Sequence, residues 1–296
     1  MGRQVCDCRC GPQSEISSLN AYLEVKMELS TIERKDSGIQ ITYETIGDES
    51  AEPLLFLHGL GAGRIQTTRA FTALGNQRLI APDMLGHGDS VAENHDCVLS
   101  FDQFAEDSIA ILDDMGIEKA NVGGLSMGAG ISINIALRFP ERVNKLVLLR
   151  PCWLSEKKPE HLQLVGFVGQ WIEQFGTDKA RSLLHDHAVY KELAERLPRV
   201  AISIDFLFTR PHFFSHTAVL YRMWQDAPFS NLESLSRITN ETLVLCTTRD
   251  ELHPIPVAQA IDRHLPSSRM LQLPPRYDQP REYGLELNRA IADFLS

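Results

Sequence analysis

The stretch GGLSMG, Gly123–Gly128, decides how this chain is interpreted. It follows an apolar run typical of a buried strand, ANVGG at 120–124, and opens a helix-like segment at 126–140. A serine on such a sharp strand-to-helix turn has a strained backbone, and glycines two residues to either side prevent clashes with the neighbouring strand and helix. The helix N-terminus then offers N–H groups to a developing negative charge. The stretch therefore predicts that Ser126 is a nucleophile.

Short apolar runs alternate with helix-like segments along the rest of the chain. Runs typical of strands lie at 39–45, 53–59, 78–83, 120–124, 144–150, 242–248 and 269–274, and helix-like segments lie at 100–116, 126–140 and 281–295. Continuous apolar runs suit strands that are buried on both faces of a parallel sheet. Their alternation with helices predicts a doubly wound α/β sheet with helices on both faces.

The interval 151–238 breaks this rhythm because it contains no convincing strand. We predict a helical insertion after the sixth strand, whose aromatic side chains pack mostly on one another and partly line a pocket. These aromatics are Trp153, Phe167, Trp171, Phe175, Phe206, Phe208, Phe213, Phe214, Tyr221 and Trp224. The predicted organisation is a flexible extension at 1–26, a core formed by 27–150 and 239–296, and a helical cap at 151–238.

Composition excludes several classes of function. The formal net charge of -10 argues against nucleic acid and anionic membranes as partners, because both reward basic patches. We find no apolar run long enough to span a bilayer and no secretory signal, so we expect a cytoplasmic protein. Cys6, Cys8 and Cys10 crowd together without a further Cys or His pair nearby, so we expect a flexible tail and no metal.

Two further glycine-rich stretches follow predicted strands. HGLGAG, His58–Gly63, ends one run, and PDMLGHGDS, Pro82–Ser90, ends the next. Glycines let a backbone approach a ligand closely. We expect His58 to bond the loop backbone rather than to carry protons, His87 to be part of a tight turn, and Asp83 to bond local backbone.

These motifs, together with TTRDELHP at 247–254, resemble the α/β-hydrolase superfamily in order and separation over nearly all of 27–296. The resemblance implies an eight-stranded, mostly parallel sheet with a helical cap, and it implies Ser126 as the nucleophile. It assigns Asp250, after the seventh strand, as the acid that orients the base, with Glu251 as the local alternative. It implies no cofactor.

The same layout predicts where the oxyanion of the reaction is held. One donor is the N–H after the nucleophile, here Met127, and the other comes from the loop after the third strand, here Leu60. Gly59 and His58 belong to the same loop. We therefore include these four residues in the predicted oxyanion and substrate site.

The usual base is absent from its expected place. The family has a histidine just after the eighth strand, where this chain has PPRYD, 274–278. Arg276 cannot accept a proton, Tyr277 is a poor base at neutral pH, and Asp278 would drive serine deprotonation weakly. His253, three residues past Asp250, is the first candidate for the base, because its loop should reach the mouth of the site. The alternative is a histidine at the pocket rim or before a helix.

Two classes of function follow from the sequence. The first is a hydrolase, or an acyltransferase, that acts through a serine on a small, largely apolar carboxylic ester or related acyl compound. The second is a weak or inactive homologue that serves as a ligand-binding module, a hypothesis that the absent histidine favours. An interaction protein that uses its acidic surface is a third option. The sequence leaves the oligomeric state open.

Overall fold

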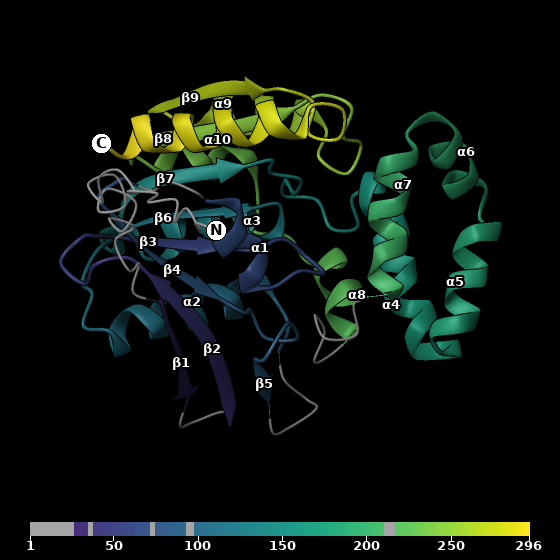
Figure 1. Ribbon diagram of the computed structural model, residues 1–296, viewed down its shortest axis with the longest axis horizontal. Helices are drawn as coiled ribbons and strands as arrows, with labels where there is room; N and C mark the ends of the chain where they lie inside the picture. The colour runs from purple at the N-terminus through teal and green to yellow at the C-terminus, as the bar shows by residue number, and fades with distance from the viewer. Residues whose placement is uncertain (1–26, 35–37, 72–74, 93–97, 210–216) are drawn as a thin grey trace, which may run out of the picture.

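The computed structural model describes residues 27–34, 38–71, 75–92, 98–209 and 217–296, and over these ranges the chain forms a nine-stranded sheet (Figure 1). The strands are β1 Met27–Arg34, β2 Ile39–Ile46, β3 Glu52–Leu57, β4 Gln77–Pro82, β5 Val91–Ala92, β6 Ala120–Leu125, β7 Val143–Leu149, β8 Thr242–Thr247 and β9 Ser268–Leu273. Their order is β1-β2-β4-β3-β6-β7-β8-β9, and the short β5 pairs with β2. The eight-strand layout implied by the resemblance counts β1 but not the short β5, so its sixth, seventh and eighth strands are β7, β8 and β9.

Most of the sheet is parallel. β1 and β4 pair antiparallel with β2, whereas β4, β3, β6, β7, β8 and β9 pair in parallel. The carboxyl ends of parallel strands meet at one edge of a sheet, which is where α/β folds bind ligands. The loops after β3, β6, β7, β8 and β9 therefore converge, although they lie far apart in the sequence.

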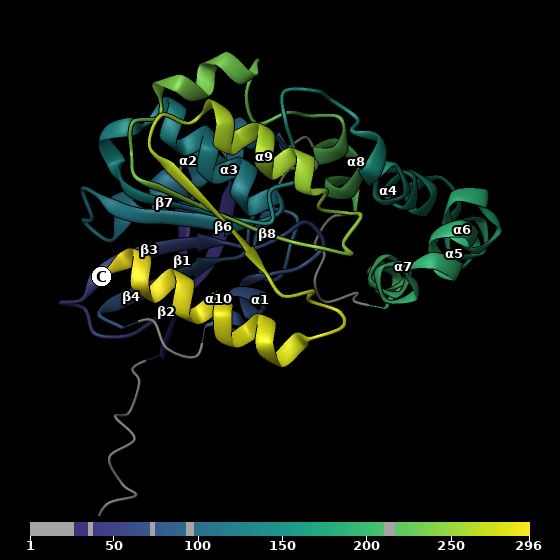
Figure 2. The ribbon, with the colours of Figure 1, turned by 90° about the horizontal axis from the view of Figure 1, so that it is seen from above.

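Helices cover both faces of the sheet, so two cores form. In Figure 2, α2, α3 and α9 lie on one side of the sheet, and α1 and α10 lie on the other. The larger core joins β-strand side chains to α2, α3 and α9, and the smaller joins them to α1 and α10. All six residues of β8 are buried, as expected for a strand covered on both faces. The predicted α/β class and mostly parallel sheet are confirmed.

The helices were predicted less completely than the strands. They are α1 Arg64–Ala70, α2 Phe101–Asp114, α3 Met127–Arg138, α4 Gln163–Phe175, α5 Thr177–Asp186, α6 Ala188–Arg196, α7 Pro198–Asp205, α8 Ala218–Trp224, α9 Ile255–His264 and α10 Pro280–Leu295. Short 3-10 turns occur at Pro140–Arg142, Glu160–Leu162, Phe206–Phe208 and Leu232–Arg237. α2, α3 and α10 lie within the predicted helical segments, apart from one residue at the start of α10.

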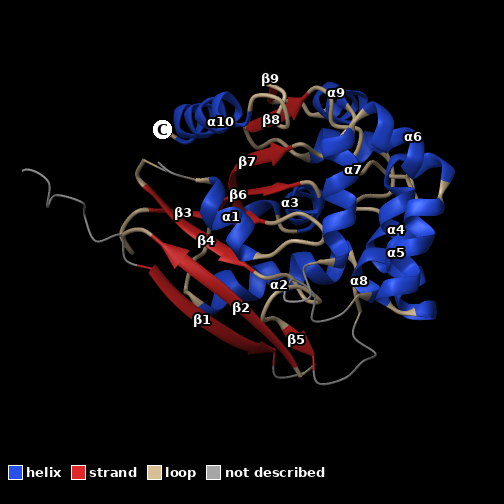
Figure 3. Cartoon of the chain, turned by 45° about the vertical axis from the view of Figure 1, so that its right-hand side comes forward, coloured by secondary structure: helices blue, strands red, loops and turns tan. Residues whose placement is uncertain are grey.

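The elements between β7 and β8 are helical. Residues 151–209 and 217–238 contain α4–α8 and no strand, and Figures 1 and 3 show α4–α7 standing to one side of the sheet. A separate apolar cluster of side chains from α4–α8 holds these helices together, and Leu60 and Leu252 of the sheet loops pack against it. We call α4–α8 the insertion helices.

Some expectations fall beyond these ranges. The extension at 1–26, with Cys6, Cys8 and Cys10, lies outside the described residues. Within the described part of the chain, none of the helices has the length and apolar character needed to cross a membrane.

Candidate active site

Ser126 occupies a strained turn between β6 and α3. Its backbone has φ 59° and ψ -112°, a left-handed φ that a residue other than glycine adopts only when its surroundings enforce it. The Ser126 N–H donates to the Leu149 carbonyl at 2.9 Å, and the Ser126 carbonyl accepts from the Ala129 N–H at 3.0 Å. These bonds to β7 and α3 hold the turn. The Ser126 side chain is thereby held where β6 ends.

Two glycines leave the space that this turn needs. A Cβ at Gly124 would lie 2.3 Å from the Gly128 carbonyl carbon, and one at Gly128 would lie 2.2 Å from the Leu57 carbonyl oxygen. Both distances are far below van der Waals contact, and both neighbours are backbone atoms that cannot rotate away. The spacing of GGLSMG thus reflects the packing of α3 against β3 and β6.

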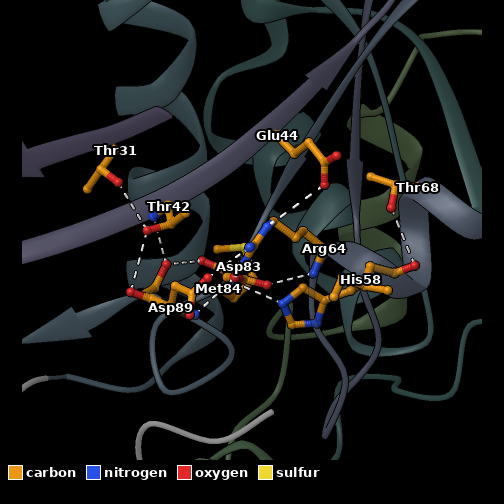
Figure 4. Close-up of polar contacts among 11 residues, drawn as sticks. Thr31, Thr42, Glu44, His58, Arg64, Thr68, Asp83, Met84 and Asp89 are labelled. Carbon is orange, nitrogen blue, oxygen red and sulfur yellow. Dashed lines mark hydrogen bonds and ion pairs between the residues drawn. The ribbon is translucent and has the colours of Figure 1, made fainter. Parts of the chain in front are cut away.

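Two buried histidines support the loop after β3. The His58 Nδ1–H donates to the Gly59 carbonyl at 2.9 Å. On the other side of the ring, His58 Nε2 accepts the Met84 N–H at 2.9 Å (Figure 4). His87 Nε2 accepts the Gly61 N–H at 3.1 Å. Burial lowers the pKa of both imidazoles, so both are neutral at pH 7. His58 does not line the cavity described below, so the structure does not place it in the predicted oxyanion and substrate site. Its contacts are with loop backbone, which is the other role that the sequence predicts for it.

Asp83 ties the loop after β4 to the start of α1. Its carboxylate accepts the Arg64 N–H at 2.6 Å and the Asp89 N–H at 3.0 Å, and it also pairs with the Arg64 guanidinium (Figure 4). Because α1 follows the glycine-rich loop, this contact fixes the loop from its far end. The predicted backbone-bonding role of Asp83 matches these bonds.

The two expected oxyanion donors come from the loop after β3 and from the first turn of α3. The Gly59 N–H donates to the Gln66 side chain at 2.8 Å. The next residue, Leu60, also lines the cavity and is the remaining predicted donor of this loop. Met127 is the first residue of α3, and a first-turn N–H has no intrahelical carbonyl to bond. Leu60 lines the cavity together with Ser126, and Met127 directly follows Ser126 in the chain, so the oxyanion role of both stays a prediction.

Asp250 and His253 lie together after β8. His253 Nδ1 is 2.9 Å from Asp250 Oδ2, and the side chains are 9% and 0% exposed. The ring N–H is not well aimed at that oxygen, so the two atoms are in contact without an ideal hydrogen bond. The other predicted acid, Glu251, instead pairs with Arg196 of α6 and is partly exposed. The structure therefore brings His253 to Asp250 rather than to Glu251.

The protonation states of this pair follow from its neighbours. Burial alone would raise the pKa of Asp250, but the charges of His253 and Arg150 hold it well below its usual range. Burial lowers the pKa of His253, and the cations Arg150 and Arg276 lower it further, against the opposing charge of Asp250. At pH 7 Asp250 is therefore a carboxylate and His253 is neutral, the state in which an imidazole can accept a proton.

The sequence RPCW, 150–153, adds two residues that sequence reasoning missed, Arg150 and Cys152. Arg150 Nη1 donates to Asp250 Oδ2 at 2.8 Å, and the Cys152 Sγ lies 3.1 Å from Ser126 Oγ. Burial raises the pKa of the Cys152 thiol, so it is a neutral partner and not a base. Within the described ranges, Ser126 Oγ hydrogen-bonds to this thiol and to no imidazole. The position of RPCW directly after β7, between β6 and β8, is the signal that could have found these residues.

Arg276 lies where the family's histidine is expected. It follows β9, and its side chain lines the same cavity as Ser126 and His253. The charge of Arg150 and then burial lower the pKa of Arg276, but a guanidinium stays protonated in proteins. Asp278 does not reach the cavity, because it pairs with Arg249 at 3.1 Å.

One cavity of about 130 Å³ connects these groups. Its core side carries the polar and charged groups, and its other side is formed largely by apolar residues of the insertion helices and the turn before them. The lining residues are Gly59, Leu60, Gly61, Ala62, Gln66, Leu125, Ser126, Arg150, Trp153, Leu162, Val165, Ser203, Ile204, Leu207, Leu252, His253, Arg276 and Tyr277. The largely apolar pocket that the sequence predicts is thus apolar on one side only. Over the described residues, no cluster of three His, Cys, Asp or Glu side chains is arranged to hold a metal ion.

Comparisons with known proteins agree with this architecture. The profile of the alpha/beta hydrolase fold matches residues 52–278. A 2-hydroxymuconate semialdehyde hydrolase of Pseudomonas sp. (strain CF600) is 31% identical over 225 residues, which cover 69% of this chain and 72% of that protein.

Two solved structures share the fold. A meta-cleavage product hydrolase from Pseudomonas fluorescens IP01 has a TM-score of 0.66 at 24% identity, covering 92% of this chain and 98% of that one. A thermophilic esterase from Thermogutta terrifontis has a TM-score of 0.67 at 21% identity, and the match covers 90% of this chain and 98% of the esterase.

Proposed function

The chain belongs to the alpha/beta hydrolase fold family, and on that premise we propose that it hydrolyses small acyl compounds with Ser126 as nucleophile, His253 as general base and Asp250 as the acid that orients the base. One observation carries the proposal: Ser126 and His253 line the same cavity, and His253 Nδ1 lies 2.9 Å from the buried Asp250 carboxylate.

The proposed reaction begins with proton transfer. Since Nδ1 of His253 faces Asp250, Nε2 is the nitrogen left to accept the Ser126 proton. The serine oxygen attacks the substrate carbonyl, and His253 then returns the proton to the leaving group. The Ser126 hydroxyl must exchange its bond to Cys152 for one to His253, a change in keeping with catalytic hydrogen bonds that tighten only when substrate is bound. Water, activated by the same imidazole, releases the acyl group.

The charge that develops on the carbonyl oxygen needs donors. The N–H groups of Leu60 and Met127 are the proposed oxyanion hole, and the loss of one such donor typically costs about 10²–10³ in turnover. The helix dipole of α3 adds positive potential at the same point. The hydrogen bonds of His58 and His87 to the loop backbone keep the Leu60 amide in place.

The substrate class is set by the size of the cavity and by the relatives. A cavity of about 130 Å³ admits a short acyl chain. The named relatives hydrolyse a semialdehyde or are called esterases and meta-cleavage product hydrolases. We propose a carboxylic ester or a related acyl compound, and the same residues would serve hydrolysis of a carbon–carbon bond next to a carbonyl.

A panel of 4-nitrophenyl esters with short acyl chains tests the proposal. Ser126→Ala should abolish turnover, and His253→Ala should lower kcat by at least about 100-fold, the usual contribution of a general base. His264→Ala is the matched control, because His264 ends α9, where its Nδ1–H donates to the Ala260 carbonyl. Equal activity in the wild type and His253→Ala would remove His253 from the mechanism.

A second candidate function is a ligand-binding module with little catalysis. The observation that favours it is the Ser126–Cys152 hydrogen bond at 3.1 Å, which occupies the hydroxyl. No turnover of any ester by the wild type, together with no labelling of Ser126 by a fluorophosphonate, would support this function over the first.

A further inference from the structure

Arg276 lines the cavity beside the proposed nucleophile and base without a carboxylate to pair with. The acids nearest to it in the chain and in the site are engaged elsewhere: Asp278 pairs with Arg249 at 3.1 Å, and Asp250 pairs with Arg150 at 2.8 Å. Across the part of the chain that the structure describes, no Asp or Glu lies within ion-pair distance of Arg276. Its guanidinium lies 5.0 Å from the centre of the Tyr277 ring.

The cavity consequently has an excess positive charge. Arg150 and Asp250 offset each other as a buried pair with side chains 2% and 0% exposed, and His253 is neutral. Arg276 is left as a partly buried cation. A charge held away from water is costly unless it is paired. An anion that entered the cavity would therefore be stabilised by pairing with the Arg276 guanidinium.

We propose that Arg276 binds a carboxylate of the substrate, so that the enzyme acts on short acyl compounds that carry a free carboxylate. This inference rests on the proposed hydrolase function and names its substrate class. The planar guanidinium presents donors in a fork that matches a carboxylate with two parallel hydrogen bonds. The residue at the family's histidine position would thus serve specificity here, while His253 serves as the base.

The size of the cavity limits how far the carboxylate lies from the reacting carbonyl. Ser126 and Arg276 line one space of about 130 Å³, so only a few bonds can separate the two groups. Monoesters of short dicarboxylic acids, and short acids with a second carbonyl, meet this requirement. The apolar side chains of Leu162, Val165 and Ile204 on the opposite side of the cavity suit the hydrocarbon part of such a molecule.

A matched pair of substrates tests the proposal. Monoethyl glutarate carries a free carboxylate and diethyl glutarate does not. A pH-stat at pH 8, above the lowered pKa of His253 in the wild type, measures kcat/KM for both. The wild type should prefer the monoester. Arg276→Gln should lower the monoester-to-diester ratio by at least about tenfold, the expected scale for a lost charge-assisted pair, and the ratio cancels any general loss of activity.

Two further variants make the result specific. Arg249→Gln removes a nearby arginine that does not line the cavity, and its ratio should equal that of the wild type. Arg276→Lys keeps the charge but loses the planar fork, so it should give an intermediate ratio, and it tests the inference if Arg276→Gln does not fold. A wild-type preference for the diester, or an unchanged ratio in the Arg276 variants, overturns the inference.

A binding measurement tests the carboxylate site independently of the proposed hydrolase function. Glutarate titrated calorimetrically into Ser126→Ala should bind, and the double variant Ser126→Ala/Arg276→Gln should bind it at least about tenfold more weakly. If no ester is hydrolysed but glutarate binds through Arg276, the hydrolase function fails and the anion site stands. If glutarate does not bind Ser126→Ala, or binds both proteins equally, the anion site fails.

Discussion

Arg150→Met should destabilise the protein by about 3 kcal/mol at pH 8. The Arg150 and Asp250 side chains are 2% and 0% exposed and lie 2.8 Å apart. Removing one partner of a buried ion pair typically costs about 3–5 kcal/mol, because the other charge remains buried and uncompensated. We expect the lower end of that range, because His253 lies 2.9 Å from the same Asp250 oxygen. Methionine preserves most of the side-chain volume of Arg150, so the loss of stability measures the effect of removing the positive charge.

Urea unfolding followed by tryptophan fluorescence measures this loss, and a double-mutant cycle assigns it to the pair. Asp250→Asn should also destabilise, and Arg150→Met/Asp250→Asn should recover part of the sum, with a coupling energy of about 2 kcal/mol. Arg249→Met is the matched control: its pair with Asp278 is 61% and 42% exposed, so it should cost less than about 1 kcal/mol.

The same variant should change how stability depends on pH. The pKa of Asp250 is lowered in the folded protein, so its contribution is complete above the unfolded pKa of about 3.9 and is lost as pH falls through the folded value. Without Arg150 the pKa of Asp250 rises, and the gap in stability between wild type and variant should narrow below about pH 4. A variant within about 0.5 kcal/mol of wild type at pH 8, or strictly additive single changes, would refute the reasoning.

Three further predictions concern the base, the turn and the insertion helices. Because burial and the neighbouring arginines lower the pKa of His253, kcat/KM should stay constant as pH falls below about 6.5 and decline only at the lowered pKa; a decline beginning above that pH contradicts this. Gly124→Ala, whose Cβ would lie 2.3 Å from helix backbone, should cost at least about 3 kcal/mol in urea unfolding. Gly284→Ala in α10, where nothing lies within 4 Å of the added Cβ, should instead stabilise the protein by about 0.5–1 kcal/mol. Equal changes in stability for Gly124→Ala and Gly284→Ala would disprove the argument that Gly124 is required for the packing of α3. Arg196→Ala, which breaks an exposed pair with Glu251, should change thermal stability by less than about 1 kcal/mol, and a larger loss would show that this pair holds α6 to the core.

The sequence predicted the central strands and the edge strand β9 closely, but it missed β1 and β5 at the opposite edge. Strands buried on both faces need continuous apolar runs, and β3, β7 and β8 begin and end within two residues of the predicted ranges. β1, MELSTIER, is largely exposed along its length, so no apolar run marks it as a strand. The strand β5 pairs only with β2, and its two residues are too few to show a periodic pattern in the sequence.

The site was predictable to the extent that local motifs define it. Ser126 follows from its glycines, and the proximity of His253 to Asp250 follows from their spacing in one loop. Arg150 and Cys152 were missed because their roles depend on which strands are neighbours, and strand order is a property of the whole sheet. Arg276 was considered only as a failed base, because its lack of an acidic partner becomes visible only when Asp278 is seen to face Arg249.

The rate at which a fluorophosphonate labels Ser126 tests the central claim most directly. The reagent reacts only with an activated hydroxyl, and mass spectrometry of the labelled peptide identifies the residue. We predict labelling of the wild type at Ser126, at least about 100-fold slower labelling of His253→Ala, and an unchanged rate in His264→Ala. Labelling of the wild type and His253→Ala at equal rates, or no labelling of Ser126, would contradict an imidazole held by Asp250 as the base for this serine.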